Sequence, residues 1–340
     1  MKIGHAELVS LLQHAAIKVV SSEAATYFAE ETVETEIRKG NRTDPLKAAL
    51  KDLEACFKHL GVKPAHVVDL PAYFSIDFKS HGPLLYLKEI HDELERRSNQ
   101  NGIAMAAFTN SQSMHTLHEW VQGLAKRGLV AIAICNGGPG AVVPFNGTRG
   151  VFGTNPMAYG LPGENGEAYC IDMATSEIPF FEIMEAHSEG KPLRERSAVN
   201  KNGEFTTNAS EALDFSASET DPVSNIVPIG GGYKGYYLVF LLELLTSGLI
   251  GMPSSPEMSA DFIPEEHGAV LIVFNPQAMG TGERFGRSLN ALHTALRSQT
   301  PKAGERIPIP GESNNVRFFE AKNKEVDVDD QLLEKLRALQ

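Results

Sequence analysis

Between residues 72 and 135 the chain alternates between short apolar runs and longer segments with helical spacing of apolar residues. The expected strands are Ala72–Ile76, Ile103–Phe108 and Leu129–Cys135, and the expected helices between them are Leu84–Arg97 and Met114–Arg127. Strands that alternate with helices in this way must pack as layers around a shared core. The pattern therefore predicts an α/β fold.

The segments on either side of this run extend the prediction. Residues 6–60 have mostly helical periodicity, and the later segments Ile178–Ser188 and Arg284–Arg297 are expected to be helices, with a strand at Ala269–Phe274. Residues 189–226 are polar and are expected to form an exposed excursion. The most apolar segment, Tyr236–Gly251, contains Glu243 and is shorter than the roughly 20 residues of a membrane span, so a buried helix is expected there.

Composition narrows the class of protein. With 340 residues, of which 42% are hydrophobic, the chain can bury a large core in one large domain or two ordinary ones. A net charge of −12 argues against a nucleic-acid surface, although local backbone N–H groups and a few cations can still bind an anion. Three widely spaced cysteines and the lack of a signal-peptide pattern lead us to expect a cytoplasmic protein without disulfides, and no membrane partner.

Several common motifs are missing. The sequence has no strand followed by GxGxxG with an acidic residue about 20 positions later, and no GxxxxGK[ST], so a nucleotide would have to bind in another way. It has neither HExxH nor paired CxxC motifs, and its histidines are scattered. We therefore expect no metal site.

Two polar clusters in otherwise apolar sequence indicate where a site lies. They are Gly153–Pro156, which reads GTNP, and Asp172–Ser176, which reads DMATS. These clusters, together with three other landmarks, resemble the malate/L-lactate dehydrogenase family that is unrelated to Rossmann-type enzymes. The other landmarks are Asn110-Ser111, Gly232–Tyr236 and Arg306–Glu312, and the likeness covers roughly Ala6 to Glu312.

The resemblance implies a fold, a cofactor and a class of reaction. The implied fold is a large, mainly antiparallel sheet flanked by helices, which binds NADH or NADPH in a non-Rossmann manner at the cleft of a homodimer. On this basis we expect residues 1–62 to form a helical region with part of the substrate site, residues 63–312 to form the NAD(P)-binding and catalytic domain, and residues 313–340 to form a C-terminal tail. The family reduces 2-oxo acids, diketo sugar acids or cyclic ketimine carboxylates, and the partner expected here is a small carboxylate.

This chain departs from the family pattern where the proton donor is expected. Family members carry Ser-His-Gly after a motif resembling ADLRG, whereas the matching stretch here, Glu36–Pro45, has no histidine. Thr43 or Asp44 takes its place, and Lys47 falls near the position of a residue that binds the substrate carboxylate. Ser80-His81-Gly82 copies the letters of the motif but lies only twenty residues before Gly102, so we do not interpret His81 as the donor.

The resemblance also assigns roles to other residues. Thr154 and Asn155 are expected at the substrate, although they could simply form a turn, and Glu182 is expected to partner the proton donor, although a solvated position on a helix is an equal alternative. The family's tandem histidines after Asn-Ser are replaced by Gln112 and Ser113, with His115 and His118 nearby. The residues expected at the cofactor are Ser113, Met114, His115, Thr116, Asp172, Met173, Ala174, Lys234, Arg306, Pro310, Gly311 and Glu312. The alternatives without a cofactor contact are a helix cap for Asp172 and a surface loop for Arg306.

The substitution near position 44 bears on the substrate. Hydride transfer to a ketone creates an alkoxide, which needs an acid beside it. A protonated ketimine already carries positive charge, so a nearby carboxylate such as Asp44 favours its iminium form. The sequence therefore favours reduction of a cyclic ketimine carboxylate, Δ1-pyrroline-2-carboxylate or its six-membered homologue. The alternatives are a 2-oxo acid reductase with a Tyr or His acid from elsewhere, and a catalytically silent homologue that binds a ligand.

Overall fold

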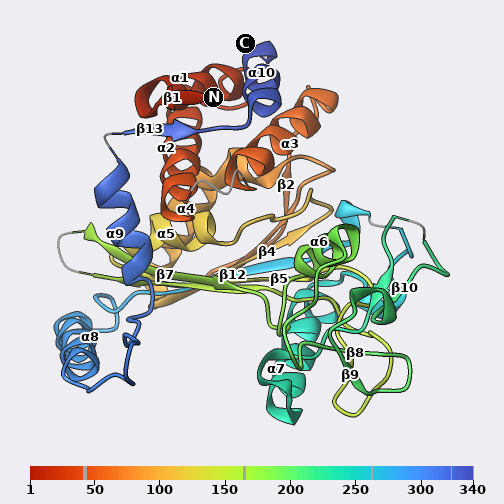
Figure 1. Cartoon of the computed structure of the whole chain (residues 1–340). Coiled ribbons are helices and arrows are strands. Elements are labelled where there is room, and N and C mark those ends of the chain that lie inside the picture. The colour runs from red at the N-terminus through yellow and green to blue at the C-terminus, as the bar shows by residue number, and fades with distance from the viewer. Residues whose placement is uncertain (41–43, 164–165, 219, 262, 323, 340) are drawn as a thin grey trace.

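A mixed sheet forms the centre of the molecule. The computed structural model describes residues 1–40, 44–163, 166–218, 220–261, 263–322 and 324–339. Within these residues the main sheet has seven strands in the order β2-β3-β4-β12-β5-β6-β7, and only the β3–β4 pair is parallel (Figure 1). Its strands are β2 (Ala65–Leu70), β3 (Tyr73–Asp77), β4 (Ile103–Thr109), β5 (Val130–Cys135), β6 (Met157–Pro162), β7 (Ala168–Met173) and β12 (Ala269–Phe274). The predicted mainly antiparallel sheet is confirmed.

Helices cover both faces of this sheet (Figure 1). One face carries α4 (Leu87–Asn101) and α5 (His118–Lys126), over which the N-terminal helices α1 (His5–Ala16), α2 (Ser22–Arg38) and α3 (Asp44–Lys58) are stacked. The other face carries α7 (Tyr233–Thr246). The remaining helices are α6 (Phe180–Glu189), α8 (Gly282–Arg297), α9 (Glu312–Ala321) and α10 (Asp330–Ala338).

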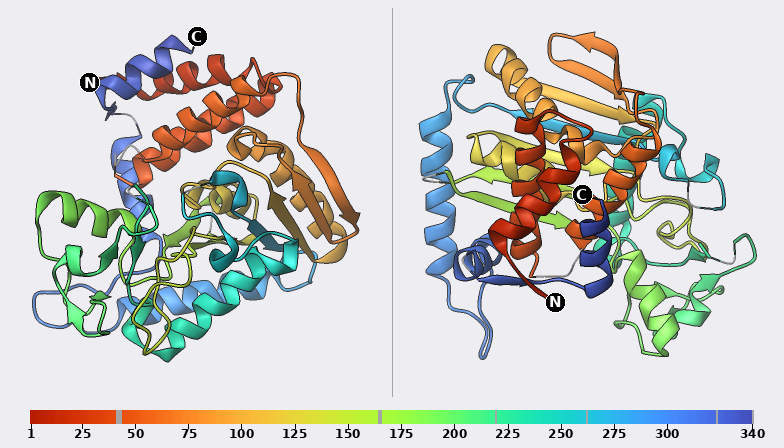
Figure 2. Two further views of the ribbon diagram at one scale, coloured as in Figure 1. Left: turned by 90° about the vertical axis from the view of Figure 1, so that its right-hand side faces the viewer. Right: turned by 90° about the horizontal axis from the view of Figure 1, so that it is seen from above.

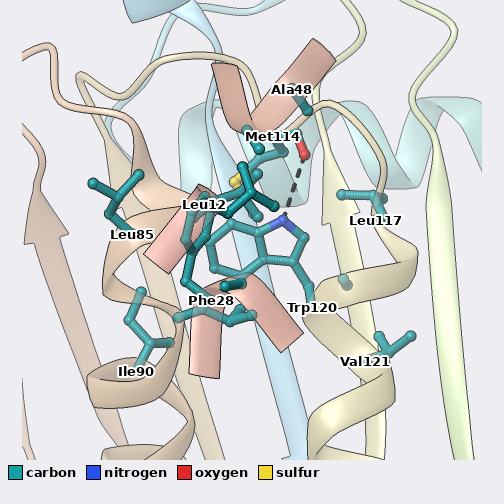
Figure 3. Packing of buried hydrophobic residues seen from close by; sticks show 14 of the residues in the cluster. Leu12, Phe28, Ala48, Leu85, Ile90, Met114, Leu117, Trp120 and Val121 are labelled. Atoms are coloured by element: carbon teal, nitrogen blue, oxygen red, sulfur yellow. Dashed lines mark hydrogen bonds between the residues drawn. The ribbon is translucent and has the colours of Figure 1, made fainter. Parts of the chain in front are cut away.

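The main core lies between the sheet and the N-terminal helices. Trp120 of α5 is fully buried there and packs beside Leu12, Phe28 and Leu85 (Figure 3). Alanines line the sheet beneath it, at positions 104, 106, 131 and 133, all fully buried. Small side chains let a helix with a large aromatic residue approach the sheet closely without leaving a void. The packing explains why these strands are rich in alanine.

The C-terminal residues return to the N-terminal helices. Strand β13 (Glu325–Asp327) pairs with β1 (Lys2–Gly4), and α10 packs against α1, so the two chain ends lie together (Figures 1 and 2). Leu333 and Leu336 of α10 belong to the main core. The division at residues 62 and 312 stays a prediction, but residues 325–338 complete the helical region.

Four details differ from the sequence expectations. Strand β2 was not predicted, and α5 begins at His118 rather than at Met114 because residues 111–117 form a loop. The segment 189–226 is not simply an exposed excursion. It contains the strands β8 (Ala198–Val199), β9 (Phe205–Thr206), β10 (Leu213–Asp214) and β11 (Val223–Ser224), and shares a small core with α6. Helix α7 was expected to be buried, yet one of its faces is exposed, including Tyr237, Leu241 and Leu244.

None of the helices in the described ranges has the length and hydropathy needed to cross a membrane.

Candidate active site

Three chain segments meet where β7 ends. The Thr175 N–H donates to the carbonyl oxygen of Thr154 at 3.0 Å, and the Ile229 N–H donates to the carbonyl oxygen of Thr175 at 2.9 Å. The GTNP and DMATS clusters and the glycine turn that precedes α7 therefore lie side by side. The two landmarks that stood out in the sequence belong to one site.

A cation from the N-terminal helices reaches into this site. Lys39 directly follows α2, and its Nζ lies 2.8 Å from both Asp172 Oδ2 and Thr116 Oγ1. The Thr116 hydroxyl also donates to Asp172 Oδ2 at 2.8 Å. The side chains of Lys39 and Asp172 are 24% and 11% exposed, so the pair is largely shielded from solvent. We call Lys39, Thr116 and Asp172 the ammonium–carboxylate cluster.

One nearby histidine is buried and neutral. His118 Nε2 lies 3.1 Å from Gln122 Oε1. Burial lowers the pKa of His118 to about 4, with Lys39 and Arg38 acting in the same direction and Asp172 opposing them. At neutral pH His118 therefore has no proton to donate as an imidazolium.

A second histidine is placed differently. His115 Nε2 lies 3.4 Å from Oδ1 of Asp52, a residue of α3 that is fully buried. Asp52 Oδ2 accepts the Leu84 N–H at 2.9 Å. Gly82 packs so closely on Asp52 that a Cβ there would lie 2.3 Å from the Asp52 Cβ. This contact accounts for the glycine of Ser80-His81-Gly82, whose histidine instead lies buried 3.0 Å from the Tyr86 hydroxyl.

The glycine turn before α7 already uses two of its backbone donors, because the Gly230 N–H donates to Glu177 Oε2 at 2.9 Å and the Gly231 N–H donates to the Pro228 carbonyl oxygen at 2.8 Å. Gly230 and Gly231 have positive φ, and a Cβ at either position would meet no atom within 4 Å. The helix begins after Gly232 without a side-chain cap, and Lys234 in its first turn is exposed. Free N–H groups at the start of a long helix, with an ammonium group beside them, favour an anion. The first turn of α7 with Lys234 is therefore the part of this segment that suits a phosphate group.

The second group of residues expected at the cofactor lies at the start of β7. Gly311 has a φ of +81°, and a Cβ there would lie 2.7 Å from the Cys170 nitrogen. Glu312 pairs with Arg297 at 2.6 Å, while Arg306 and Pro310 are exposed. The strand rises about 3.4 Å per residue. Two residues along β7 separate the Gly311 contact from Asp172, so this loop and the ammonium–carboxylate cluster are roughly 7 Å apart, a spacing that an extended coenzyme can span.

Asn155 has a supporting position. It is fully buried, its Nδ2 donates to Glu243 Oε2 at 2.7 Å, and its Oδ1 accepts the Gly137 N–H at 3.0 Å. Glu243 also accepts hydrogen bonds from Asn136 and Ser255. The one acidic residue of the apolar α7 is therefore the centre of a buried network that holds the GTNP loop. The hydroxyl of the neighbouring Thr154 makes no hydrogen bond with the described residues.

The other expected residues are more dispersed. Asp44 and Lys47 are exposed in the first turn of α3, and Glu182 is half-buried in α6 with Arg194 4.0 Å away. Thr43 lies outside the described residues. Among those expected at the cofactor, Met173 is exposed beside Asp172, Ala174 is half-buried, and Ser113 accepts the His115 N–H. The Met114 side chain packs into the main core (Figure 3).

Sequence reasoning did not single out Lys39 or Asp52. Lys39 lies within the stretch that departs from the family pattern, so the departure itself was a usable signal. Asp52 lies between apolar residues of α3, and an acidic residue on the buried face of an amphipathic helix is a comparable signal.

Comparison with known proteins defines the class that this fold and site represent. The family model for malate/L-lactate dehydrogenase matches residues 5–337, and the chain belongs to that family. Its members are NAD(P)-dependent dehydrogenases and reductases.

Individual relatives differ in their substrates. The chain is 28% identical over 248 residues to ureidoglycolate dehydrogenase (NAD(+)) of Escherichia coli O157:H7, covering 71% of this chain and 67% of that protein. It is 32% identical over 216 residues to the Δ1-pyrroline-2-carboxylate/Δ1-piperideine-2-carboxylate reductase of Pseudomonas syringae pv. tomato, covering 62% of this chain and 59% of that protein. The solved structure of a Δ1-piperideine-2-carboxylate reductase from the same organism matches with a TM-score of 0.79 at 24% identity, over 100% of both chains.

Proposed function

We propose that this protein reduces a cyclic ketimine carboxylate with NADH or NADPH. The substrate would be Δ1-pyrroline-2-carboxylate, which gives L-proline, or Δ1-piperideine-2-carboxylate, which gives L-pipecolate. The observation that carries the proposal is the carboxylate of Asp44, which with Thr43 is one of the two residues that can take the place of the family's histidine. Asp44 is exposed at the start of α3 and has no ion pair with any described residue. A relative with this activity is 32% identical to the chain over the matched region.

The negative charge of the Asp44 carboxylate suits an iminium substrate. A carboxylate stabilises the protonated C=N bond that accepts hydride, whereas it would oppose the alkoxide formed from a ketone. Lys47, one turn further along α3 and also exposed, is the proposed partner of the substrate carboxylate, together with Thr154. Glu182 is a further candidate for the proton pathway.

The bound coenzyme supplies the hydride. The proposed protein contacts are the glycine turn with Lys234, the segment Asp172–Ala174, the loop Ser113–Thr116, and the Arg306–Glu312 loop. Both Asp172 and Thr116 belong to the ammonium–carboxylate cluster. The positions of these groups beside and along β7 support a coenzyme that lies along this edge of the sheet.

A substrate panel tests the proposal. Purified protein is assayed with each coenzyme against the two cyclic ketimines, pyruvate and oxaloacetate. We expect turnover of at least one ketimine with a kcat/KM that exceeds those for the 2-oxo acids. Robust turnover of a 2-oxo acid alone would contradict the proposal. Coenzyme binding without reduction of any of these compounds would instead favour a silent homologue.

A crystal soaked with NADPH and pyrrole-2-carboxylate, a planar analogue of the ketimine, tests the placement. We expect the analogue to lie against the nicotinamide ring with Asp44 facing its nitrogen. An Asp44 side chain directed away from the ring would contradict the role assigned to it.

A further inference from the structure

The loss of the family's histidines raises the question of which group supplies the proton for the reduction. A cyclic ketimine must gain one proton and one hydride to become the amine. Asp44 can stabilise the protonated C=N bond, but an ionised carboxylate holds no proton to give. His118 is buried and neutral. The donor must therefore come from elsewhere in the site.

We propose that His115 and Asp52 form an Asp–His dyad in which the His115 imidazolium is the proton donor of the reaction. This inference rests on the proposed function. His115 Nε2 is buried and lies within ion-pair distance, 3.4 Å, of Asp52 Oδ1, and neither atom has a hydrogen-bonding partner among the described residues. His115 Nδ1 makes no hydrogen bond with any residue that the structure describes, and the His115 side chain is 17% exposed. One ring nitrogen is thus held by a carboxylate while the other is free to face a ligand.

His115 is the basic side chain that lies within ion-pair distance of the buried Asp52. Asp52 is fully buried, and burying an unpaired carboxylate costs several kcal/mol. Burial raises the pKa of Asp52, and His115 is the largest influence in the opposite direction. A buried carboxylate beside an imidazole orients the ring and stabilises its protonated form. The Leu84 N–H and the close backbone of Gly82 fix the position of the carboxylate.

The backbone places this dyad beside the site. Thr116, the next residue, hydrogen-bonds to Asp172, and Asp52 lies two turns along the helix that begins at Asp44. His115 itself has a φ of +50°, in the left-handed region that costs a residue with a Cβ of order 1 kcal/mol. A hydrogen bond from its N–H to Ser113 Oγ, at 3.2 Å, holds this conformation. Left-handed backbone in a loop that faces a cofactor is typical of a side chain positioned for a reaction.

The chemical step balances with these groups. His115 Nδ1–H donates its proton to the imine nitrogen, which gives the iminium ion and leaves a neutral imidazole. Hydride from NADH or NADPH adds to the imine carbon, the C=N π bond breaks, and its electron pair stays on nitrogen as the amine lone pair. The oxidised coenzyme and the cyclic amino acid result, and solvent returns the proton to His115.

The first test does not depend on turnover. The ring-nitrogen resonances of His115 are recorded by NMR in the coenzyme-free protein, with their signals assigned through His115→Gln. Asp52→Asn should change the resonance of Nε2 more than that of Nδ1, because the partner carboxylate of Nε2 is lost. The other titratable groups near the pair are Lys51 and Cys56 on α3 and Glu119 on α5, and these are unchanged in the variant. Unchanged His115 ring resonances would overturn the dyad.

The second test uses the reaction. His115→Gln should lower kcat for the ketimine about 100-fold, as expected for loss of a general acid, while the Kd for NADPH stays within about twofold. Asp52→Asn should move the basic limb of the pH–rate profile to lower pH, a change that a purely structural role would not cause. The exposed His14→Gln is the matched control and should behave as the parent protein.

The outcomes separate the two proposals. If the parent protein reduces the ketimine and His115→Gln does so equally well, the dyad is wrong and the proposed function stands. If the parent protein reduces no substrate, the proposed function fails, and the donor role fails with it. Should Asp52→Asn fail to fold, His115→Gln still decides the question, because its amide can face Asp52 in place of the imidazole.

Discussion

The ammonium group of Lys39 lies 2.8 Å from the carboxylate of Asp172, and this pair connects the end of α2 to the end of β7. These residues are 133 positions apart in the sequence. The contact is the direct polar link between the N-terminal helices and the segment expected to bind the coenzyme. It gives the helical region a defined position over the site.

Replacing Lys39 tests this link. Lys39→Met should leave Asp172 partly buried without its cation, at a cost of about 1–3 kcal/mol in the free energy of unfolding, and should raise the KM for the coenzyme. Lys39→Arg should restore most of the stability and bring the KM for the coenzyme close to that of the parent protein. Urea denaturation and steady-state kinetics measure the two effects. An unchanged KM would mean that the pair only supports the fold.

Asp44 is tested against a matched residue on the same helix. Asp44→Asn should lower kcat for the ketimine by about 10-fold or more, since it removes the charge that favours the iminium ion. Glu54→Gln, an equally exposed acidic position on α3, should have no effect. Undiminished imine turnover in Asp44→Asn would remove the basis of the ketimine assignment.

Thr154 and Asn155 are neighbours in sequence, but we predict that replacing Asn155 lowers stability whereas replacing Thr154 weakens substrate binding. Asn155→Ala removes a donor to the buried Glu243 and should cost about 2–3 kcal/mol of stability. Thr154→Ala should change stability by less than about 1 kcal/mol but should raise the KM for the substrate. Thermal unfolding and kinetics of the two variants separate them. A stability loss in both variants, without a change in KM, would indicate that the loop has only a structural role.

Buried histidines predict a loss of stability in acid. Burial lowers the pKa of His91 to about 3, and the same cause lowers the pKa values of His118 and His267 to about 4. The unfolded chain binds these protons below about pH 6.5 while the folded chain does not, so the free energy of unfolding falls as pH decreases below 6.5. Each group should contribute about 2 kcal/mol of loss by pH 5.

Urea titrations at pH 7 and pH 5 measure this loss. His91→Gln should reduce the difference in the free energy of unfolding between pH 7 and pH 5 by about the contribution of one histidine. An identical difference in that variant would show that other groups cause the acid sensitivity.

The exposed face of α7 predicts a partner. Tyr233, Tyr237, Phe240, Leu241 and Leu244 are each close to half exposed or more in the single chain. We propose that a second copy covers this face, as the resemblance to a homodimeric family implies. Leu241→Glu combined with Leu244→Glu should convert a dimer to a monomer in light scattering. A monomeric parent protein, or a dimer unaffected by the changes, would contradict this.

Much of the fold could be predicted because packing leaves a pattern in the sequence. Strands β4, β5 and β12 are apolar runs that are buried on both faces, and their positions agree with expectation. Strand β2 was missed because most of its side chains are exposed at the edge of the sheet, so it lacks that pattern. Helix α7 is apolar on most of its surface, and such a sequence is equally typical of a helix buried in a core and of a helix at a protein–protein interface.

The site could be predicted only where the polar residues lie close together in sequence. The GTNP and DMATS clusters stood out, and the structure brings them together. Lys39 and Asp52 did not stand out. Each is notable only for its contact, with Asp172 and His115 respectively, and these partner residues lie far away along the chain. Individual side chains also differ within one cluster, since Asn155 is buried and hydrogen-bonded while the Thr154 hydroxyl has no partner among the residues that the structure describes.

The pairing of β1 with β13 has a consequence for synthesis in the cell. Lys2 pairs with Asp327, so the helices that follow β1 obtain a strand and a helix from residues that are synthesised more than 300 positions later. Contacts of such high sequence separation form late and slowly. The helical layer, although made first, must wait for residues 325–338 before its core is closed, and nascent chains stalled before that point should remain sensitive to proteases.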